Sequence, residues 1–205
     1  MRPLIPALFL FLVLAAPASA QMKGTWTVGA GIGKVKTTAS ELGSKPTFQP
    51  MFGRLPSEGW GFAFAFNWFS ADVLGTFVGV DEKIGRLRTR PLMFGVGYTA
   101  SRGKFSFTPS VVAGPSFNTF KIDDRFDDIF EVDASSFEER IGAVSLAARP
   151  GVNVTYAFTS RLGVTGFGGY IFNRPSFTVH APGGDVETSW KSDGIVGSVG
   201  LIFSF

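Results

Sequence analysis

Large apolar side chains alternate with small ones along most of the sequence, and this two-residue period is the strongest constraint on its fold. In the segment WGFAFAFNW, residues 60–68, aromatic rings occupy every second position, and glycine, alanine or asparagine fills the positions between them. Successive side chains of a β-strand point to opposite faces, so the segment predicts a strand with one large apolar face and one small face. After residue 20 no apolar run reaches the roughly 20 residues that a membrane-spanning helix needs, so we expect an all-β chain.

The same alternation recurs often enough to count strands. Five more segments show it clearly, and they cover residues 25–34, 92–98, 105–117, 144–158 and 194–205. Two further segments alternate less regularly: residues 47–55 contain Pro50, and residues 162–174 change phase near Gly168-Gly169, as they would at a β-bulge. The total is eight strands, and an even number is typical of bacterial outer-membrane barrels.

The connections between these segments alternate in length. Residues 56–59, 100–104 and 159–161 form short connections, whereas residues 36–46, 70–83, 121–139 and 179–192 form long ones. Outer-membrane barrels have short periplasmic turns and longer extracellular loops. We therefore expect an eight-stranded antiparallel up-and-down transmembrane β-barrel with both termini in the periplasm, in which the large apolar faces contact lipid.

The first 20 residues predict export. Arg2 is followed by an apolar run from Leu4 to Ala16 and then by Ala18-Ser19-Ala20, a small-x-small pattern typical of signal-peptidase cleavage. We expect residues 1–20 to be a cleaved secretory signal peptide. Residues 21–205 are then expected to form a single barrel domain, located in the outer membrane after export across the inner membrane.

A soluble eight-stranded barrel of the lipocalin type is the main alternative. Such a barrel needs a charged exterior, but the small-residue face of these segments carries almost no charge and suits the lining of a narrow lumen. Aromatic residues also cluster at the predicted periplasmic ends of the strands, and they are Trp26, Trp60, Tyr98, Tyr156 and Phe158. Such a cluster is typical of the aromatic belt at a membrane interface, so the membrane barrel is favoured.

The chain resembles the small outer-membrane β-barrel family of the OmpA, OmpX and OmpW type. The signal sequence, the rhythm of eight strands and the apolar C-terminal strand carry this resemblance, which covers residues 21–205. In that family the barrel-assembly machinery recognises a C-terminal strand of alternating apolar residues that ends in Phe. The matching residues here are Ile195, Val199, Leu201, Phe203 and Phe205. The resemblance implies an architecture and an assembly partner, but no particular activity, because such barrels have many functions.

Composition excludes several kinds of chemistry. The chain has no cysteine and one histidine, His180, which excludes disulfides, thiol catalysis and most zinc sites. Without Arg2, 18 basic residues face 16 acidic ones, and this small excess predicts no nucleic-acid binding. The set Ser176, His180, Asp185 and Glu187 matches the catalytic group of lipid A deacylases only loosely, because no serine stands two residues after the histidine. We expect no enzyme activity, cofactor or metal.

One charged residue falls on the small-residue face near the middle of a strand. Arg149 has no acidic residue at a predicted inward position of the same depth, and its candidate partners are the amides of Gln49, Asn67 and Asn153. A buried guanidinium without a carboxylate is costly unless water or amides satisfy it. We expect either a hydrated lumen with weak anion preference or a closed plug in which backbone carbonyls bind the arginine.

Basic residues lie beyond the last apolar residue on most strands, at the predicted extracellular side. They are Lys34, Lys36, Arg86, Arg88, Arg90, Lys121, Arg140, Arg174 and Lys191. A lipid-facing cation costs only ~0–1 kcal/mol near the interface, and the phosphates of lipopolysaccharide would lie at about this height. The alternative is that these are ordinary strand ends with snorkelling side chains. A change of phase at Pro91 or at Gly168-Gly169 would also turn some of the arginines inward.

Residues 121–139 hold half of the 16 acidic residues. The segment lacks the spacing of an EF-hand and is either a solvated hairpin tip or a contact site for an extracellular partner or for divalent cations between lipopolysaccharides. The functional hypothesis is a non-enzymatic outer-membrane barrel that stabilises the envelope and presents extracellular interaction loops. The alternatives are a small pore for polar or apolar solutes and, as a distant third, a lipid A-modifying enzyme.

Overall fold

The structure is a computed structural model that describes residues 26–39, 42, 45–77, 80–122, 140–181, 184–189 and 191–205. In chain order its strands are β1 (Trp26–Thr37), β2 (Lys45–Arg54), β3 (Gly59–Phe66), β4 (Trp68–Phe77), β5 (Val80–Arg102), β6 (Phe105–Ile122), β7 (Arg140–Ala157), β8 (Leu162–Asn173), β9 (Ser176–Ala181), β10 (Gly184–Ser189) and β11 (Gly194–Ser204). Within these residues there is no helix with the length and hydropathy needed to cross a membrane.

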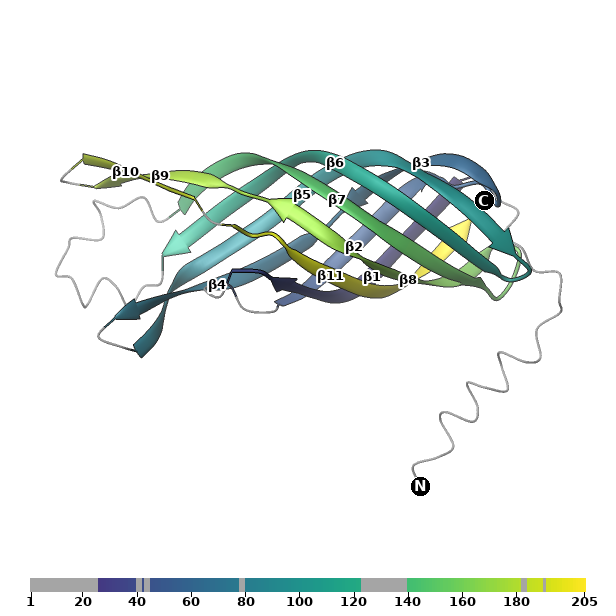
Figure 1. Ribbon diagram of the computed structural model, residues 1–205, viewed down its shortest axis with the longest axis horizontal. Coiled ribbons are helices and arrows are strands. Elements are labelled where there is room, and N and C mark those ends of the chain that lie inside the picture. Colours follow the sequence, from purple (N-terminus) through teal and green to yellow (C-terminus); the bar gives the residue numbers. More distant parts are fainter. Residues whose placement is uncertain are drawn as a thin grey trace, which may run out of the picture.

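Nine of the strands form one closed antiparallel sheet (Figure 1). Its order is β1-β11-β8-β7-β6-β5-β3-β2-β4, and further pairings of β1 with β2 and of β5 with β4 close the sheet into a barrel. β3 and β4 are two halves of one barrel strand, interrupted at Asn67, so the nine strands make an eight-stranded barrel. The predicted all-β, eight-stranded antiparallel up-and-down barrel is confirmed. β9 and β10 form a separate two-stranded sheet.

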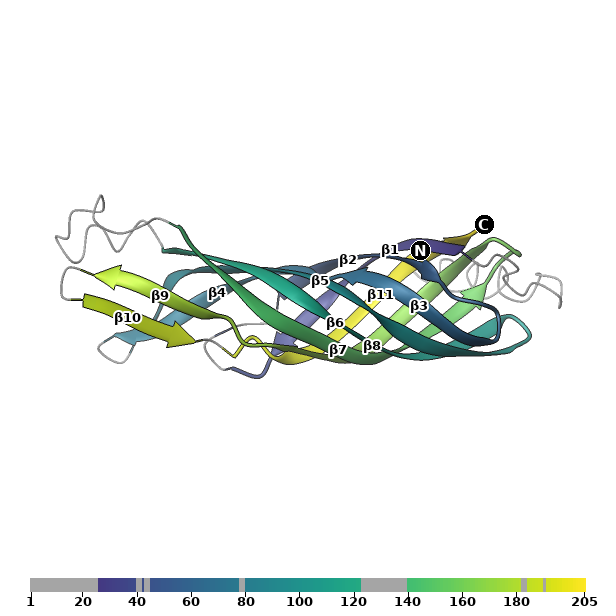
Figure 2. The ribbon, with the colours of Figure 1, turned by 90° about the horizontal axis from the view of Figure 1, so that it is seen from above.

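The barrel has two unlike ends (Figure 2). At the first, here named the turn end, the connections 55–58, 103–104 and 158–161 are short, β1 begins and β11 ends. Gly59 and Gly103 have positive φ angles of 105° and 62° at two of these turns, a conformation that glycine adopts without strain. Trp26 N donates to Phe205 O at 3.2 Å and closes the barrel there. At the other, the loop end, β4, β5 and the β9–β10 hairpin reach past the rest (Figure 1).

The strands extend farther at the loop end than the sequence predicts. Residues 70–83 and 179–192 were expected to be loops, but β4 pairs with β5 as far as Phe77 and Val80, and β9 pairs with β10. The alternation continues in β4 and β5 with opposite polarity, since Val73 and Leu87 are buried inside the barrel while Arg86 is exposed outside. A pattern of outward apolar residues does not detect such strands because their outward positions are polar.

Side chains sort by face as they do in a membrane barrel. Large apolar residues at outward positions are exposed, with relative accessibilities of 75% for Leu146 and 73% for Ile32 and Trp60. Inward positions between them are mostly Thr, Ser, Ala and Gly. This exterior suits hydrocarbon rather than water, so the lipocalin-type alternative is wrong. At the turn end the ring centroids of Trp60 and Tyr98 lie 5.5 Å apart, within the aromatic cluster that the sequence predicts.

β8 keeps one register with β7 and β11, so the predicted change of phase near Gly168-Gly169 is wrong. The pattern misleads because Phe167 points into the barrel, where the alternation calls for a small side chain. Two paired glycines make room for this ring, since a Cβ at Gly151 or Gly169 would lie 2.4 or 2.7 Å from its Cζ atom. Because these two glycines have no Cβ, the aromatic ring of Phe167 fits inside the barrel.

Candidate functional site

A buried arginine connects opposite walls of the barrel. Arg149 of β7 is 6% exposed, and its Nη1 donates hydrogen bonds to Asn67 Oδ1 at 3.0 Å and to Gln49 Oε1 at 3.4 Å. Gln49 belongs to β2, which lies four barrel strands from β7 in either direction around the sheet. These three side chains therefore cross the lumen, and we name them the lumen bridge.

Neighbouring side chains hold the lumen bridge in place. Ser198 Oγ donates to Gln49 Oε1 at 2.8 Å, and Asn67 Nδ2 donates to Thr47 Oγ1 at 3.0 Å. The guanidinium carbon of the arginine lies 4.3 Å from the centroid of the Phe167 ring. A cation over an aromatic face is attracted by the ring quadrupole, and more strongly when water is excluded. The orientation of each group in the bridge is thus set by a second contact.

Neutral groups surround the positive charge. In the part of the chain that the structure describes, the hydrogen-bond acceptors of Arg149 are side-chain amide oxygens, not carboxylates or backbone carbonyls. Asn153 is not brought to the arginine, and its Oδ1 is buried without a hydrogen-bond partner. Gln49 Nε2 and Arg149 Nε are also buried without a partner. The site therefore holds a net positive charge and retains capacity for further polar contacts.

Buried apolar side chains form three clusters in the lumen. One cluster comprises Ala65, Met93, Val112 and Ala147. A second comprises Val35, Phe69, Phe167, Ile171 and Val196. A third, formed by extended strands of the loop end, comprises Leu42, Ala71, Val73, Leu87, Phe120 and Phe177. The described part of the lumen is thus lined by apolar clusters as well as by the polar bridge.

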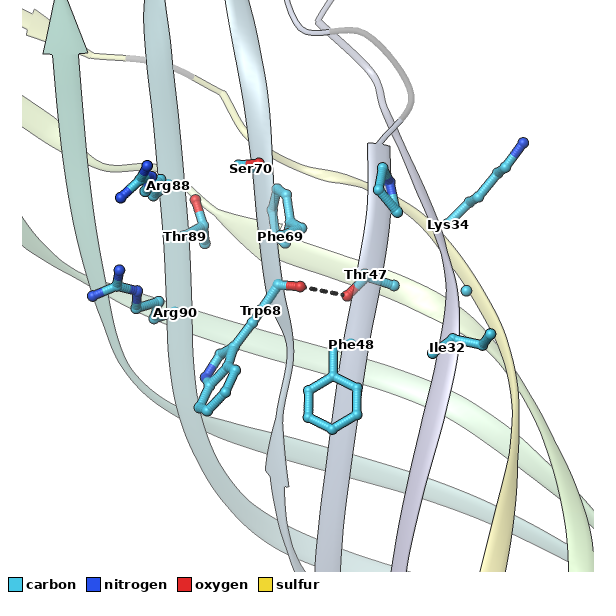
Figure 3. A pocket seen from close by; sticks show the side chains of 12 residues that line it. Ile32, Lys34, Thr47, Phe48, Trp68, Phe69, Ser70, Arg88, Thr89 and Arg90 are labelled. Atoms are coloured by element: carbon cyan, nitrogen blue, oxygen red, sulfur yellow. Dashed lines mark hydrogen bonds between the residues drawn. The ribbon is translucent and has the colours of Figure 1, made fainter.

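A groove of about 790 Å³ lies on the outer surface over β1, β2, β4 and β5 (Figure 3). β2 and β4 pair only through Thr47 with Phe69 and through Phe48 with Trp68. The next residue of β2 toward the loop end is Pro46, which has no N–H to continue the ladder. The backbone pairing of the two strands therefore ends at this point, and the groove lies over the gap.

The groove has an apolar floor and cationic sides. Ile32 pairs with Phe48, and Phe48 pairs with Trp68, across neighbouring strands. We call such a row of paired residues a rung, and all three residues of this rung are exposed. On the next rung toward the loop end, Lys34 lies at one side and Arg88 at the other, with a proline and a serine between them. Figure 3 shows the arginines of β5 and the lysine of β1 on opposite sides of the aromatic floor. We name this site the cationic groove.

Among the described residues, the three cations of the groove have no acidic neighbour. β5 keeps one register with β6 past Pro91, so its arginines face outward as predicted, and the alternative, a change of phase at Pro91, does not occur. The groove's cations have no hydrogen bond or ion pair to any described residue, and they are Lys34, Arg88 and Arg90. Their cross-strand neighbours are Pro46 and Gly197 for Lys34, Ser70 and Thr119 for Arg88, and Phe117 for Arg90.

Arg86, by contrast, is engaged by a carboxylate. Its Nε donates to Asp72 Oδ1 at 3.1 Å, and Lys45 Nζ donates to Asp72 Oδ2 at 2.5 Å. These groups lie beyond the aromatic rung, on the loop-end side of the apolar belt. The hydrogen bond from Lys45 holds the pKa of Asp72 below its ordinary value, and Arg86 acts in the same direction against the effect of burial. Arg86 is therefore less available to a ligand than Arg88.

The remaining basic residues that were predicted at the extracellular side differ in exposure and in ion pairing. Arg174 Nη2 forms an ion pair with Asp193 Oδ2 at 2.9 Å. Lys36 and Lys191 are exposed and Lys121 is half-buried, whereas the side chain of Arg140 lies outside the described residues. Of the nine basic residues predicted at this side, Arg86 and Arg174 thus form ion pairs with carboxylates, and Lys34, Arg88 and Arg90 line the groove.

The predicted assembly signal lies on the outward face of β11 and just past its end. All five residues are exposed, and they are Ile195, Val199, Leu201, Phe203 and Phe205. β11 pairs with β8 on one side and with β1 on the other, so it completes the closure of the barrel. Recognition of this strand by the assembly machinery stays a prediction.

Two other predicted features fall partly or wholly outside the described residues. The register of the β9–β10 hairpin sets His180 opposite Asp185, but neither side chain is described. Of the acidic segment 121–139, residues 123–139 are not described. Within the described ranges no group of three or more His, Cys, Asp or Glu side chains could hold a metal ion.

The sequence interpretation missed two members of the lumen site, Phe167 and Ser198. A ring among glycines in GVTGFGGY, residues 163–170, was the available signal for Phe167, but it was interpreted as a bulge. No signal in the sequence connects Ser198 with Gln49, because 149 residues separate them.

No protein-family model and no curated protein matches the chain. Solved structures do match, among them the outer membrane protein OprG from Pseudomonas aeruginosa, with a TM-score of 0.67, 13% identity, and coverage of 91% of this chain and 98% of that one. A major outer membrane protein from Thermus thermophilus matches with a TM-score of 0.58, 15% identity, and coverage of 88% and 98%. Outer Membrane Protein W of E. coli matches with a TM-score of 0.53, 14% identity, and coverage of 89% and 98%.

These likenesses confirm the predicted fold. The chain has the architecture of the small outer-membrane β-barrels, and its apolar exterior is that of an outer-membrane protein. At identities of 13% to 15% the likeness shows the fold and not a shared activity.

Proposed function

We propose that this protein is a non-enzymatic outer-membrane barrel that stabilises the envelope and presents its loop end to the outside of the cell. The lumen bridge carries the proposal, because Arg149, Asn67 and Gln49 connect opposite walls at mid-barrel. A barrel braced in this way keeps its cross-section and conducts little. The short turns at one end and the extended hairpins at the other support the orientation, with both termini in the periplasm.

Single-channel recording of the refolded protein in planar bilayers tests this proposal. We expect the wild type to give no current steps. Arg149→Ala should give small steps because it removes the side chain that crosses the lumen. Arg102→Ala, at an exposed position of the turn end, is the matched control and should stay silent. Equal steps in the wild type and in Arg149→Ala would contradict a closed barrel.

A small pore for polar solutes is the second candidate, and it is favoured by buried polar atoms around the lumen bridge. Gln49 Nε2, Arg149 Nε and Asn153 Oδ1 have no hydrogen-bond partner. Each such atom costs about 1–3 kcal/mol unless water binds it, so these atoms support a hydrated lumen. A fixed positive charge among neutral groups would then favour anions.

Asn67→Asp separates the two candidates with little change in side-chain size. It would set a carboxylate at the position now 3.0 Å from Arg149 Nη1 and neutralise the lumen. If the protein is a pore, the wild type should show a weak anion preference that Asn67→Asp abolishes and Arg149→Glu reverses. Reversal potentials in a salt gradient measure this preference, and a cation-selective wild type would exclude the arginine as its determinant.

The apolar end of β11 supports a further part of the proposal, an assembly address read by the barrel-assembly machinery. Phe205 is 58% exposed on the outward face, where it would contact lipid, and one apolar side chain that leaves water contributes only ~1.5–3 kcal/mol. Deleting Phe205 should therefore reduce insertion in cells strongly and refolding in detergent only slightly. Heat-modifiable mobility on gels reports both, and equal losses in the two assays would leave the residue with a structural role alone.

A further inference from the structure

The cationic groove has the layout of a site for a phosphorylated lipid. We propose that it binds one glycolipid that carries two phosphates, of the kind that makes up lipopolysaccharide. One phosphate would lie at Arg88 and Arg90, the other at Lys34, and acyl chains would lie over the aromatic floor. This inference rests on the proposed function, because only an outward-facing loop end places the groove in the leaflet that contains this lipid.

Charge is the first observation behind the proposal. Lys34, Arg88 and Arg90 are exposed, and no described carboxylate neutralises them, whereas Asp72 engages Arg86 and Asp193 engages Arg174. An arginine presents planar N–H groups that fit phosphate oxygens in pairs, and two arginines two residues apart on one strand can share one phosphate. Within the described residues, the groove thus brings three unpaired cations together around one hollow.

Spacing is the second observation, and it indicates two phosphates rather than one. Lys34 is on β1 and Arg88 on β5, with β2 and β4 between them. Three spacings of neighbouring strands amount to roughly 14 Å. One phosphate does not span that width, whereas a disaccharide with a phosphate at each end presents its charges to both sides.

The apolar floor is the third observation. Ile32 and Phe48 lie one rung farther from the loop end than Lys34, and Trp68 lies one rung farther than Arg88, so each lies deeper in the apolar belt than the cation beside it. Aromatic rings at this level pack against the upper part of acyl chains while the cations stay at the headgroups. The order from floor to rim matches the order from acyl chain to phosphate in one lipid molecule.

Native mass spectrometry of the protein in detergent, with purified lipids as probes, tests the inference. The probes are diphosphoryl lipid A, monophosphoryl lipid A and phosphatidylglycerol. We expect the wild type to bind one diphosphoryl lipid A about tenfold more tightly than phosphatidylglycerol. Arg88→Gln with Arg90→Gln should weaken that binding about tenfold. Lys34→Gln should remove the preference for two phosphates over one.

The matched control is Arg54→Gln with Arg102→Gln, which removes two exposed arginines at the turn end. It should bind like the wild type, and heat-modifiable mobility confirms that every variant is folded. The inference is overturned if the groove variant binds like the wild type, if the control loses as much, or if phosphatidylglycerol binds equally well. Binding in detergent does not depend on orientation or conductance, so its failure is distinct from a failure of the proposed function.

Discussion

Each face of this barrel has at least one arginine without a carboxylate partner among the described residues, and the surroundings of these arginines differ between the two faces. Inside, Arg149 is 6% exposed and is held by two amide oxygens and an aromatic ring. Outside, Arg88 and Arg90 are exposed and contact no described hydrogen-bond partner. Water and lipid headgroups can reach the outer pair, whereas only other residues of the chain or trapped water can reach the inner one.

This difference indicates that the inner arginine needs hydrogen-bond partners within the protein, whereas the outer ones do not. A buried guanidinium that loses its partners is costly, whereas a cation at the membrane interface costs only ~0–1 kcal/mol. The lumen bridge is therefore expected to affect the free energy of unfolding, and the cationic groove to affect ligand binding. The contrast between stability and binding is tested by making the same kind of substitution on the inner and on the outer face.

Charge reversal of the inner arginine should have the largest effect. Arg149→Glu sets a carboxylate against the amide oxygens of Asn67 and Gln49 and should lower the free energy of unfolding by about 3–5 kcal/mol. Arg88→Glu, the same change on the outer face, should lower it by less than about 1 kcal/mol. Urea unfolding in lipid vesicles, followed by tryptophan fluorescence, measures both. Equal small changes would mean that the lumen bridge adds nothing to stability.

Filling the space beside Phe167 should have the next largest effect. A Cβ at Gly151 would lie 2.4 Å from the ring, so Gly151→Ala forces the ring away from Arg149 and should cost about 1–3 kcal/mol. Gly168→Ala is the control, because a Cβ there meets nothing within 4 Å and faces outward. Comparable losses for the two variants in the same urea titration would show that backbone flexibility, rather than ring position, is responsible.

Removing one support of the lumen bridge should have a smaller effect. Ser198→Ala deletes the 2.8 Å hydrogen bond to Gln49 Oε1 and should cost about 0.5–1.5 kcal/mol. On the outer face, Ser70→Ala beside Arg88 removes no described hydrogen bond and should leave unfolding unchanged. The two variants are compared by urea midpoint, and a larger loss for Ser70→Ala would reverse the contrast between the faces.

The smallest expected effect concerns Asp72 and the cations that it binds, and this contribution is lost only in acid. Hydrogen bonding to Lys45 lowers the pKa of Asp72 below 3.8, so this carboxylate stabilises the folded state above that pH and loses its contribution as the pH falls through the lowered value. The site is partly exposed, so the contribution should be under about 1 kcal/mol. The difference in unfolding free energy between the wild type and Asp72→Asn, measured from pH 7 to pH 3, should shrink only below about pH 4. A difference that grows in acid would contradict the ion pair.

The alternation of side chains determined the strand count, the sorting of faces and the inward position of Arg149. It could do so because the direction of a side chain in a strand depends on local backbone geometry, which has a period of two residues. The same property explains the errors. Phe167 is a large side chain on the small face, and the loop-end parts of β4 and β5 carry polar side chains outside and apolar ones inside, so the size pattern alone assigned them wrongly.

Only the tertiary structure decided which residues meet. Asn67 and Gln49 reach Arg149 from 82 and 100 residues away, while Asn153, its neighbour on the same strand, does not. These contacts depend on the stagger at which the sheet closes, which sets the residues of opposite walls at one depth. The same holds outside, where the registers of β1 with β2 and of β4 with β5 set Lys34 and Arg88 at the two sides of one groove. Parity along one strand is a local property, but register between strands is set by the closed barrel as a whole.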